Sequence, residues 1–389
     1  MSRRFIITII TLVIIAISAG VAIFLAKGYT FSPTEKRIVG TGIITITSEP
    51  DSASVFIDGH LTTATNATVS SLAPKKYSVK VVKEGFIPWE KEIAVKEGLV
   101  TPIKLTLFPA IPTMYPLTFN GVKNPALSSD GGQLAFVVPA SGGKKAGVWV
   151  WTQVRNQPIA FARSAEPHQI AANAFTDFSE SSLRWSADSK KVLATVGNNN
   201  YLLEADRLNS DPRDITAILE PTLQSWEEDR KDKETSRVLT IQDTKMQETA
   251  SSSASIRWSP DETKFMVGDV IPGTNDVRTP ESDSGQDRMA QSANRMTNVK
   301  VYDLEEKKEY SLPPALVHMW LPDSRHIILV EEKTISVVDF DGTNKAVIYA
   351  GSFLDSFVFP WLDSSRLVII SSFPTPTASE PNLYGINLK

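Results

Sequence analysis

Four histidines are the residues most able to bind a metal ion or transfer a proton, and they are His60, His168, His318 and His326. Only His318 and His326 are close in the sequence, and the sharp turn predicted between them does not match the ligand spacing of zinc sites. The chain has no cysteine, which excludes disulfides, thiolate metal sites and a cysteine nucleophile. We therefore predict no metal site at the histidines.

The acidic segment Asp339-Phe340-Asp341-Gly342 is similar to part of a calcium-binding loop but lacks the later oxygen ligands, so we interpret it as a hairpin turn. The sequence contains no G-x-S-x-G elbow, no Walker loop and no H-E-x-x-H motif. We predict no catalytic residue, no cofactor and no enzymatic activity. One enzymatic alternative stays open, because a fold that gathers distant aspartates around a channel could hydrolyse a glycan with two carboxylates. The net charge of −4 gives no basic field, so we expect no nucleic acid partner.

An uncharged apolar run extends from Phe5 to Ala26, and a helix of this length would span about 33 Å. This length matches the hydrocarbon core of a bilayer, about 30 Å thick, where a single segment can satisfy its backbone only as a helix. We predict a transmembrane anchor over residues 1–26 that contacts the lipid bilayer through residues 5–26. The alternative is a cleaved signal peptide, whose apolar core is usually shorter.

Arg3 and Arg4 precede the apolar run and favour a cytoplasmic N-terminus, although Lys27, Lys36 and Arg37 lie just beyond it. A head of four residues cannot hold a folded domain, whereas a large β-rich body follows the run. We predict a single-pass protein of the cytoplasmic membrane with its N-terminus inside and its C-terminal domains extracytoplasmic. The polar residues 27–41 predict a short stalk.

Residues 42–108 alternate apolar and polar side chains with a period of two, which indicates half-buried strands. Asp58-Gly59 is a hairpin signal, because glycine adopts positive φ without penalty, and Pro74-Lys75-Lys76 and Glu84-Gly85 mark two further turns. Five short strands in this length predict a small antiparallel β-sandwich. They are expected near residues 44–46, 54–57, 77–81, 92–95 and 102–105.

The same residues resemble the PEGA domain, a small β-module of bacterial and archaeal surface proteins. The name-giving tetrapeptide corresponds to Pro50-Asp51-Ser52-Ala53, and the likeness continues through Val55–Gly59, Pro74–Tyr77 and Lys83–Phe86. Lys75 replaces the family's usual glycine, and the Thr-Pro after the first hairpin is missing, so the turns rather than the fold are expected to differ. The resemblance implies an adhesive or spacer module without known chemistry, in which Trp89 packs on the sheet.

A motif recurs five times between residues 125 and 365, and internal repeats of this kind indicate an array of similar units. Each copy places a strand that ends at Trp before a Ser-Pro-Asp-type turn and a second apolar strand. The Asp can accept hydrogen bonds from the amides of its own turn, and the Trp is expected to fill the gap between units. The Trp positions are Leu127, Trp185, Trp258, Trp320 and Trp361, and the turn positions are Asp130, Asp188, Asp261, Asp323 and Ser364.

These repeats resemble the TolB-like, WD-repeat-like propellers of bacterial envelope proteins over residues 112–389. The resemblance implies that the body of the chain is all-β, with blades of four strands each. A blade takes about 40–45 residues, so the longer gaps between copies predict insertions or a degenerate blade, and five to seven blades in all. The last copy lacks a fourth strand, which residues 114–119 could supply to close the ring.

In such a blade the loop between the second and third strands and the connection to the next blade open on one face. Loops at 139–146, 272–297 and 374–381 and connections at 162–180 and 217–252 gather there, and residues 225–237 could form a short helix. Long loops on a rigid scaffold are common recognition sites. We predict an extracytoplasmic binding or scaffold protein of the bacterial cell envelope, with a protein or glycan partner on this face. The binding residues stay open, and a structural surface-layer component is the alternative.

Overall fold

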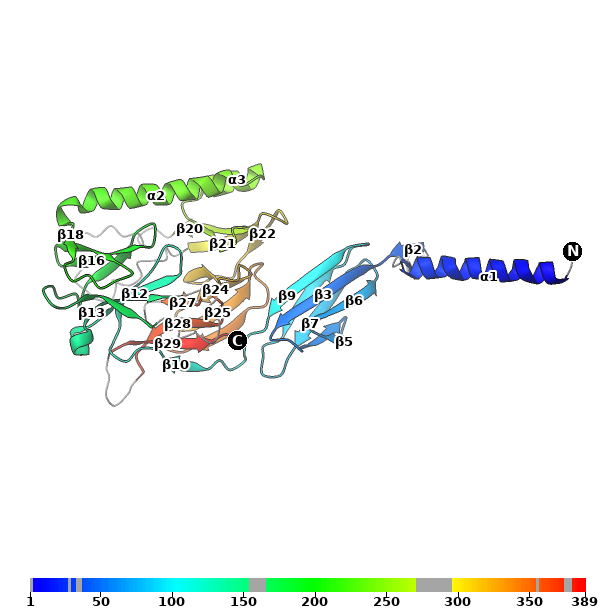
Figure 1. Ribbon diagram of the computed structural model, residues 1–389, viewed down its shortest axis with the longest axis horizontal. Helices are drawn as coiled ribbons and strands as arrows, with labels where there is room; N and C mark the ends of the chain where they lie inside the picture. Colours follow the sequence, from blue (N-terminus) through cyan, green and yellow to red (C-terminus); the bar gives the residue numbers. More distant parts are fainter. Residues whose placement is uncertain are drawn as a thin grey trace. The chain divides into compact units, whose positions relative to one another are not determined.

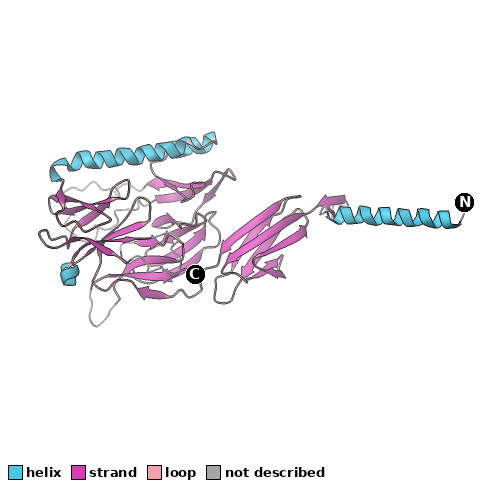
Figure 2. Ribbon diagram, in the orientation of Figure 1, coloured by secondary structure: helices cyan, strands magenta, loops and turns pink. Residues whose placement is uncertain are grey.

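The computed structural model describes residues 3–26, 29–32, 37–153, 166–270, 296–354, 357–373 and 380–389. Most of the ordered structure is strand, and the helices are confined to a few segments (Figure 2). The chain divides into two compact units, one of residues 1–111 together with Lys389 and the other of residues 112–388. The first unit contains the apolar N-terminal run and the predicted sandwich, and the second contains the repeats.

A helix, α1 (Arg3–Ala26), contains the predicted membrane segment. Among the residues that the structure describes, no helix is both long and apolar enough to cross a membrane, so the transmembrane prediction is not confirmed. The predicted stalk contains regular structure, because β1 (Tyr29–Ser32) and β2 (Arg37–Gly40) pair as an antiparallel ribbon.

Residues 42–106 form seven strands rather than the five expected, arranged as a sheet in the order β5-β4-β7-β8 and a sheet in the order β6-β3-β9. The prediction of a wholly antiparallel sandwich is wrong, because β3 and β9 run parallel from Ile43 opposite Val100 to Glu49 opposite Thr106. Parallel strands need a long crossover, which the strands between them supply. The strands are β3 (Gly42–Glu49), β4 (Ser54–Ile57), β5 (His60–Ala64), β6 (Ala67–Leu72), β7 (Lys76–Val82), β8 (Trp89–Ala94) and β9 (Val100–Thr106).

The core of this module comes from the inward-facing positions of both sheets. Fully buried apolar residues alternate with more exposed ones along the strands, as the period of two requires, and they include Ile44, Ile46, Val55, Val79 and Val81. Trp89 packs into the same core, which confirms its expected place on the sheet. The turn at Asp58-Gly59 has positive φ at both residues, 48° and 79°, which confirms the predicted hairpin.

The second unit is built from five four-stranded antiparallel sheets, which are its blades (Figure 1). Within the described residues this is the lower end of the predicted range of blade numbers. Blade one consists of β11 (Lys123–Leu127), β12 (Gln133–Val138), β13 (Gly147–Thr152) and β14 (His168–Ala172). Blade two consists of β15 (Ser182–Trp185), β16 (Lys191–Val196), β17 (Asn199–Glu204) and β18 (Arg213–Asp214).

The remaining blades follow the same order, except that the last takes a strand from the start of the unit. Blade three consists of β19 (Ile256–Trp258), β20 (Lys264–Val270), β21 (Met296–Asp303) and β22 (Lys308–Ser311). Blade four consists of β23 (Val317–Trp320), β24 (His326–Val330), β25 (Thr334–Asp339) and β26 (Ala346–Ala350). Blade five consists of β27 (Val358–Pro360), β28 (Arg366–Ser371), β29 (Asn382–Asn387) and β10 (Met114–Pro116).

The strand β10 closes blade five. It pairs antiparallel with β29, with Tyr115 opposite Gly385, and just beyond it Leu117 N donates to Leu383 O at 2.8 Å. The prediction that residues 114–119 complete the last blade is confirmed, with the strand itself limited to residues 114–116. Because β29 has neighbours on both sides, its backbone presents no free edge to another chain.

The tight turn between the first and second strands has the same geometry in all five blades. An aspartate Oδ1 accepts a hydrogen bond from the amide two residues further on, at 2.9–3.1 Å, which confirms the predicted role of this residue. The residue after each aspartate has φ between 56° and 69°, and these residues are Gly131, Ser189, Glu262, Ser324 and Ser364.

The alignment of the last repeat is wrong by one residue. Asp363 supplies the turn carboxylate, and Ser364 occupies the left-handed position after it. The hydrogen bonds of the turn decide this register, because Trp361 N donates to Arg366 O where Leu321 N donates to His326 O in blade four. Trp361 therefore lies one position beyond the place of the other tryptophans, although its residue type suggested an exact match.

Trp185 and Trp320 fill the space between neighbouring blades, as predicted. The indole Nε1 of Trp185 donates to the backbone of blade one at Ala126 O, and that of Trp320 donates to the backbone of blade three at Arg257 O, both at 2.9 Å. Each ring also packs into an apolar cluster drawn from both blades. These tryptophans hold adjacent blades together.

The long gap between Trp185 and Trp258 holds helices instead of a degenerate blade. A short 3-10 turn, η3 (Thr216–Ile218), leads into α2 (Leu219–Leu239) and α3 (Thr244–Ser252), which run end to end along the blades (Figure 1). The predicted helix at 225–237 is confirmed as part of α2. We refer to residues 219–252, which comprise α2, α3 and the short link between them, as the helical insert.

The helical insert packs on one face of blade three, at the place where a neighbouring blade would pack if the repeat continued without interruption. Its apolar residues form one cluster with Phe265, Tyr302 and Trp258, and they are Val238, Ile241, Met246 and Ala250. Polar contacts attach α2 to the tight turns of two blades, through Lys233 Nζ to Ala187 O at 3.2 Å and through the Arg237–Glu262 ion pair at 2.9 Å. Trp258 thus packs on helices and not between two blades.

Candidate functional site

The structure does not bring the four histidines together. His60 begins β5 in the first unit, and His168 on β14 contacts Ala205 O through Nε2 at 2.9 Å. His318 and His326 lie on paired strands but not opposite each other, since the register places His318 opposite Leu329. Over the described part of the chain, no group of three His, Cys, Asp or Glu residues is placed to hold a metal ion.

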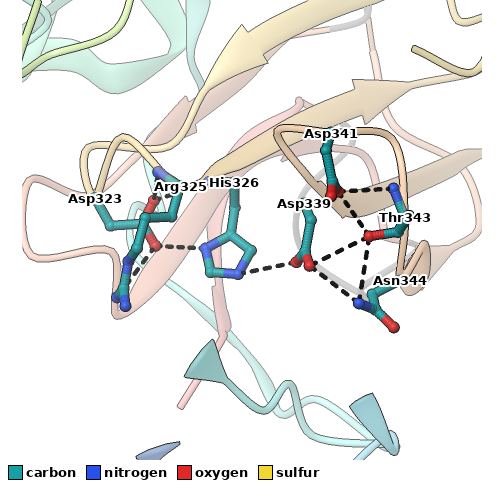
Figure 3. A network of polar contacts seen from close by, with 7 residues as sticks. All are labelled: Asp323, Arg325, His326, Asp339, Asp341, Thr343 and Asn344. Atoms are coloured by element: carbon teal, nitrogen blue, oxygen red, sulfur yellow. Dashed lines mark hydrogen bonds and ion pairs between the residues drawn. The ribbon is translucent and has the colours of Figure 1, made fainter. Parts of the chain in front are cut away.

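His326 is the centre of a buried polar network in blade four (Figure 3). Its Nδ1 lies 2.6 Å from Asp323 Oδ2, and its Nε2 lies 3.5 Å from Asp339 Oδ1. The side chain of His326 is 4% exposed, and those of Asp323 and Asp339 are 14% and 10% exposed. The imidazole therefore joins the tight turn before β24 to the end of β25.

The segment from Asp339 to Asn344 is a hairpin turn between β25 and β26, as predicted. Gly342 N donates to Asp339 O at 2.8 Å, and Asp339 N donates to Thr343 O at 3.0 Å. Asp341 Oδ1 accepts from the Thr343 hydroxyl at 2.6 Å, and Asp339 Oδ2 accepts from Asn344 Nδ2 at 3.0 Å (Figure 3). The carboxylates thus bond within their own turn.

The electrostatics of the network favour an ionised Asp323. Burial by itself would raise the pKa of Asp323, but the hydrogen bond and charge of His326 and the amide of Arg325 outweigh it and lower that pKa. A carboxylate–imidazole–carboxylate chain can relay a proton, yet His326 is 4% exposed and its two aspartates are 14% and 10% exposed, so little of this chain is accessible from the solvent. We conclude that the network holds blade four together.

Replacing Asp323 should test this role. Asp323→Asn keeps the size of the side chain but removes the charge, and we expect a loss of about 1–3 kcal/mol in unfolding free energy at pH 7, measured by urea denaturation. Because the folded-state pKa of Asp323 lies below the ordinary 3.8, its contribution is complete above pH 3.8 and is lost as the pH falls through the lower folded-state value.

The variant should therefore lose less stability than the wild type on acidification through this window. Glu332→Gln is the matched control, because Glu332 is exposed on the same blade, and it should leave both stability and its pH dependence unchanged. Equal acid sensitivity in Asp323→Asn and the wild type would contradict the assigned role.

A half-buried arginine between blades three and four was missed by the sequence reasoning. Burial lowers the pKa of Arg257 on β19 to about 10, and its Nη1 donates to His318 O on β23. Burial and this nearby charge lower the pKa of His318, whose Nε2 contacts Pro313 O at 2.9 Å. The sequence around a single arginine in a strand does not indicate that it is half-buried. Only the tertiary structure, which places Arg257 beside blade four, shows that it joins the two blades.

Three loops on one face of blade one form a continuous surface. Loop 117–122 connects blade five to blade one, loop 139–146 joins β12 to β13 through the 3-10 turn η1 (Ala140–Lys145), and loop 173–181 leads to blade two. A Cβ at Gly142 would lie 3.5 Å from Asn120 O, and Asn173 N donates to Ala146 O at 3.3 Å. These contacts place loop 139–146 beside loop 173–181, which belongs to the predicted connection 162–180. The prediction is wrong for the connection 217–252, because its helix α2 extends to the tight turns of blades two and three, which were expected on the opposite face.

The start of β11 is also joined to loop 173–181 across the boundary between blades one and two. Lys123 Nζ lies 2.6 Å from Glu180 Oε1, and Asn124 Nδ2 donates to Ser181 O at 2.7 Å. The predicted loop 272–297 lies largely outside the described residues, as do parts of loops 162–180 and 374–381. We call the surface of loops 117–122, 139–146 and 173–181 the blade-one loop face, and it is the candidate binding site.

Comparison with protein families agrees with the predicted resemblance of the first module. Residues 41–111 match the PEGA domain family. Among solved structures, a candidate TolB from Agrobacterium tumefaciens is similar over 66% of this chain and 76% of its own, with 14% identity and a TM-score of 0.24. TolB from Acinetobacter baumannii is similar over 81% of this chain and 60% of its own, with 11% identity and a TM-score of 0.23. No curated protein matches the sequence.

Proposed function

We propose that this protein is a membrane-anchored, extracytoplasmic binding or scaffold protein of the bacterial cell envelope, and not an enzyme. The observation that carries the proposal is the blade-one loop face, where loops hydrogen-bonded to one another present the exposed aromatic side chains of Phe119 and Phe175. Such surfaces supply the anchors of protein interfaces. The PEGA domain at residues 41–111 would serve as a spacer between the membrane and this surface.

The proposed anchor is α1. Its described isoleucine, leucine and valine side chains are exposed on all sides, from 45% at Ile9 to 66% at Leu12. A helix that is apolar all round is favourable only when protein or lipid covers it. Arg3 and Arg4 before this run favour retention of that end in the cytoplasm, which would place residues 27–389 outside.

A topology experiment tests the location. A reporter enzyme that is active only outside the cytoplasm, fused after residue 110, should be active and should sediment with membranes. Leu12→Asp combined with Ile15→Asp should abolish both signals, because two buried charges oppose insertion by about 5 kcal/mol or more. Leu12→Ile with Ile15→Leu is the matched control and should behave as the wild type. Activity of a cytoplasm-specific reporter at the same fusion point would refute the proposed location.

A further inference from the structure

Two phenylalanines on the blade-one loop face are unusually exposed. The side chain of Phe175 is 95% exposed and that of Phe119 is 74% exposed. Phe178, only three residues after Phe175 in the same loop, is 1% exposed and packs edge-on against Tyr201 at 5.6 Å. The loop therefore places one aromatic ring in the core and directs another to the solvent.

The loop that carries Phe175 is held in a defined conformation. Asn173 Nδ2 donates to Asp177 Oδ1 at 2.6 Å and to Ser179 Oγ at 2.7 Å, and its Oδ1 accepts from Phe178 N at 3.0 Å. Asp177 Oδ1 also accepts from Ser179 N at 3.0 Å. These bonds fix the backbone around Phe175, so that binding a partner costs little additional ordering.

The loop that carries Phe119 is fixed in a similar way. The amide of Gly121 donates to Asn382 Oδ1 at 3.1 Å, and Val122 N donates to Pro381 O at 2.7 Å. Gly121 has φ of 81°, and a Cβ at this position would lie 2.9 Å from Pro139, so the turn requires glycine. Both exposed rings are thus supported by a rigid backbone.

The charges around these rings are unevenly distributed. Lys144 and Lys145 of η1 are exposed, and within the described residues neither amino group has an ion-pair partner. Lys123 pairs with Glu180, whereas the Asp177 carboxylate accepts hydrogen bonds from neutral groups of its own loop, which leave it charged, and Glu380 lies beside Gly121 of the Phe119 loop. The Lys145 backbone is fixed because its carbonyl accepts from Trp149 Nε1 at 2.7 Å. The unpaired cations are therefore gathered on η1, and two apolar anchors beside η1 are complementary to an apolar segment whose own carboxylates lie against η1.

We infer that Phe119, Phe175, Lys144 and Lys145 bind a short acidic peptide segment of another protein, with its large apolar side chains against the two rings. This inference rests on the proposed function and specifies its partner. An anionic membrane surface is the less favourable ligand, because its charge would face the carboxylates of Asp177 and Glu180 as well as the lysines, whereas a peptide can place its carboxylates against η1 alone.

A peptide selection tests the inference. Full-length protein held in phosphatidylcholine nanodiscs is panned against a phage-displayed library of random 12-residue peptides. We expect enrichment of sequences that combine large apolar residues with Asp and Glu. Synthetic versions of these peptides should bind Phe175→Ser at least about tenfold more weakly, as the loss of one buried aromatic contact predicts. Lys144→Glu with Lys145→Glu should weaken binding at least about fivefold and reduce its dependence on salt.

Leu208→Ser is the control, because Leu208 is 53% exposed on the loop between β17 and β18, at the opposite end of its blade. It should bind the peptides as the wild type does, and all variants should keep the wild-type melting temperature, since the changed side chains are exposed.

The inference is overturned by failure of any peptide to be enriched, by enriched peptides without acidic residues, or by equal binding to Phe175→Ser. Phenylalanine-dependent binding to phosphatidylglycerol vesicles without peptide enrichment would also overturn it, in favour of a membrane. The reporter fusion measures the location of the protein, and the peptide selection measures binding to the blade-one loop face. A negative result in one experiment therefore does not imply a negative result in the other.

Discussion

Replacing residues 113–118 by a flexible Gly-Ser segment of equal length should lower the melting temperature of the second unit by about 10 °C or more and cause aggregation. The replacement removes the strand that closes blade five, where Asn387 N donates to Thr113 O at 3.0 Å and Leu383 N donates to Thr118 Oγ1 at 2.9 Å. It also frees the edge of β29, whose Leu383 and Ile386 are at most 1% exposed. An unpaired apolar edge strand is a site of association between chains.

Differential scanning calorimetry and light scattering would measure both effects. Met114→Thr is the matched control, because the Met114 side chain is 39% exposed and threonine retains the backbone pairing opposite Ile386. This control should melt as the wild type does. A Gly-Ser variant that remains monomeric with an unchanged melting temperature would show that the ring does not depend on β10.

The second large effect is expected from a charge placed beneath the helical insert. Ala250 on α3 is 1% exposed and packs in the cluster with Phe265 and Val267 of blade three. Ala250→Asp would bury a carboxylate without a partner, at a cost of about 3–5 kcal/mol, which exceeds what the packing of one short helix can offset. We expect α3 to detach and the unit to become less stable.

Limited proteolysis reports this directly, because detached α2 and α3 should be cleaved many times faster than the blades. Ser251→Asp is the matched control, since it adds the same charge to the neighbouring exposed position of the same helix. It should keep the wild-type cleavage rate. Equal protection of Ala250→Asp would mean that the helices do not depend on this contact.

The helical insert shows how the chain departs from its own repeat. Four of the five tight turns have Ser or Gly in the left-handed position, whereas blade three has Glu262, which pairs with Arg237 of α2. Between blades three and four, Asp261 N instead donates to the Ser324 hydroxyl at 3.0 Å, which joins the two turns. The residue in the left-handed position is therefore suited to the element beside its turn: Ser324 bonds to the turn of blade three, and Glu262 pairs with helix α2.

The sequence alone determined those parts of the fold that depend on local backbone chemistry. The repeated aspartate turns, the Asp58-Gly59 hairpin and the strand that completes blade five were all predicted, because period-two patterns and turn residues act over a few neighbouring positions. The likeness of residues 41–111 to the PEGA domain followed from an ordered series of such turns. A short helix at residues 225–237 was expected from the mixture of charges of both signs there, although not its full length.

Only the tertiary structure decided the features that depend on contacts between distant segments. The parallel pairing of β3 with β9, the register of the last repeat and the helices in place of a further blade each depend on hydrogen bonds or packing across many residues. The candidate site also depended on the tertiary structure, because the sequence does not distinguish an exposed phenylalanine from a buried one. Phe175 and Phe178 differ because the three-dimensional backbone directs one ring to the solvent and the other into the core, a choice that no local pattern encodes.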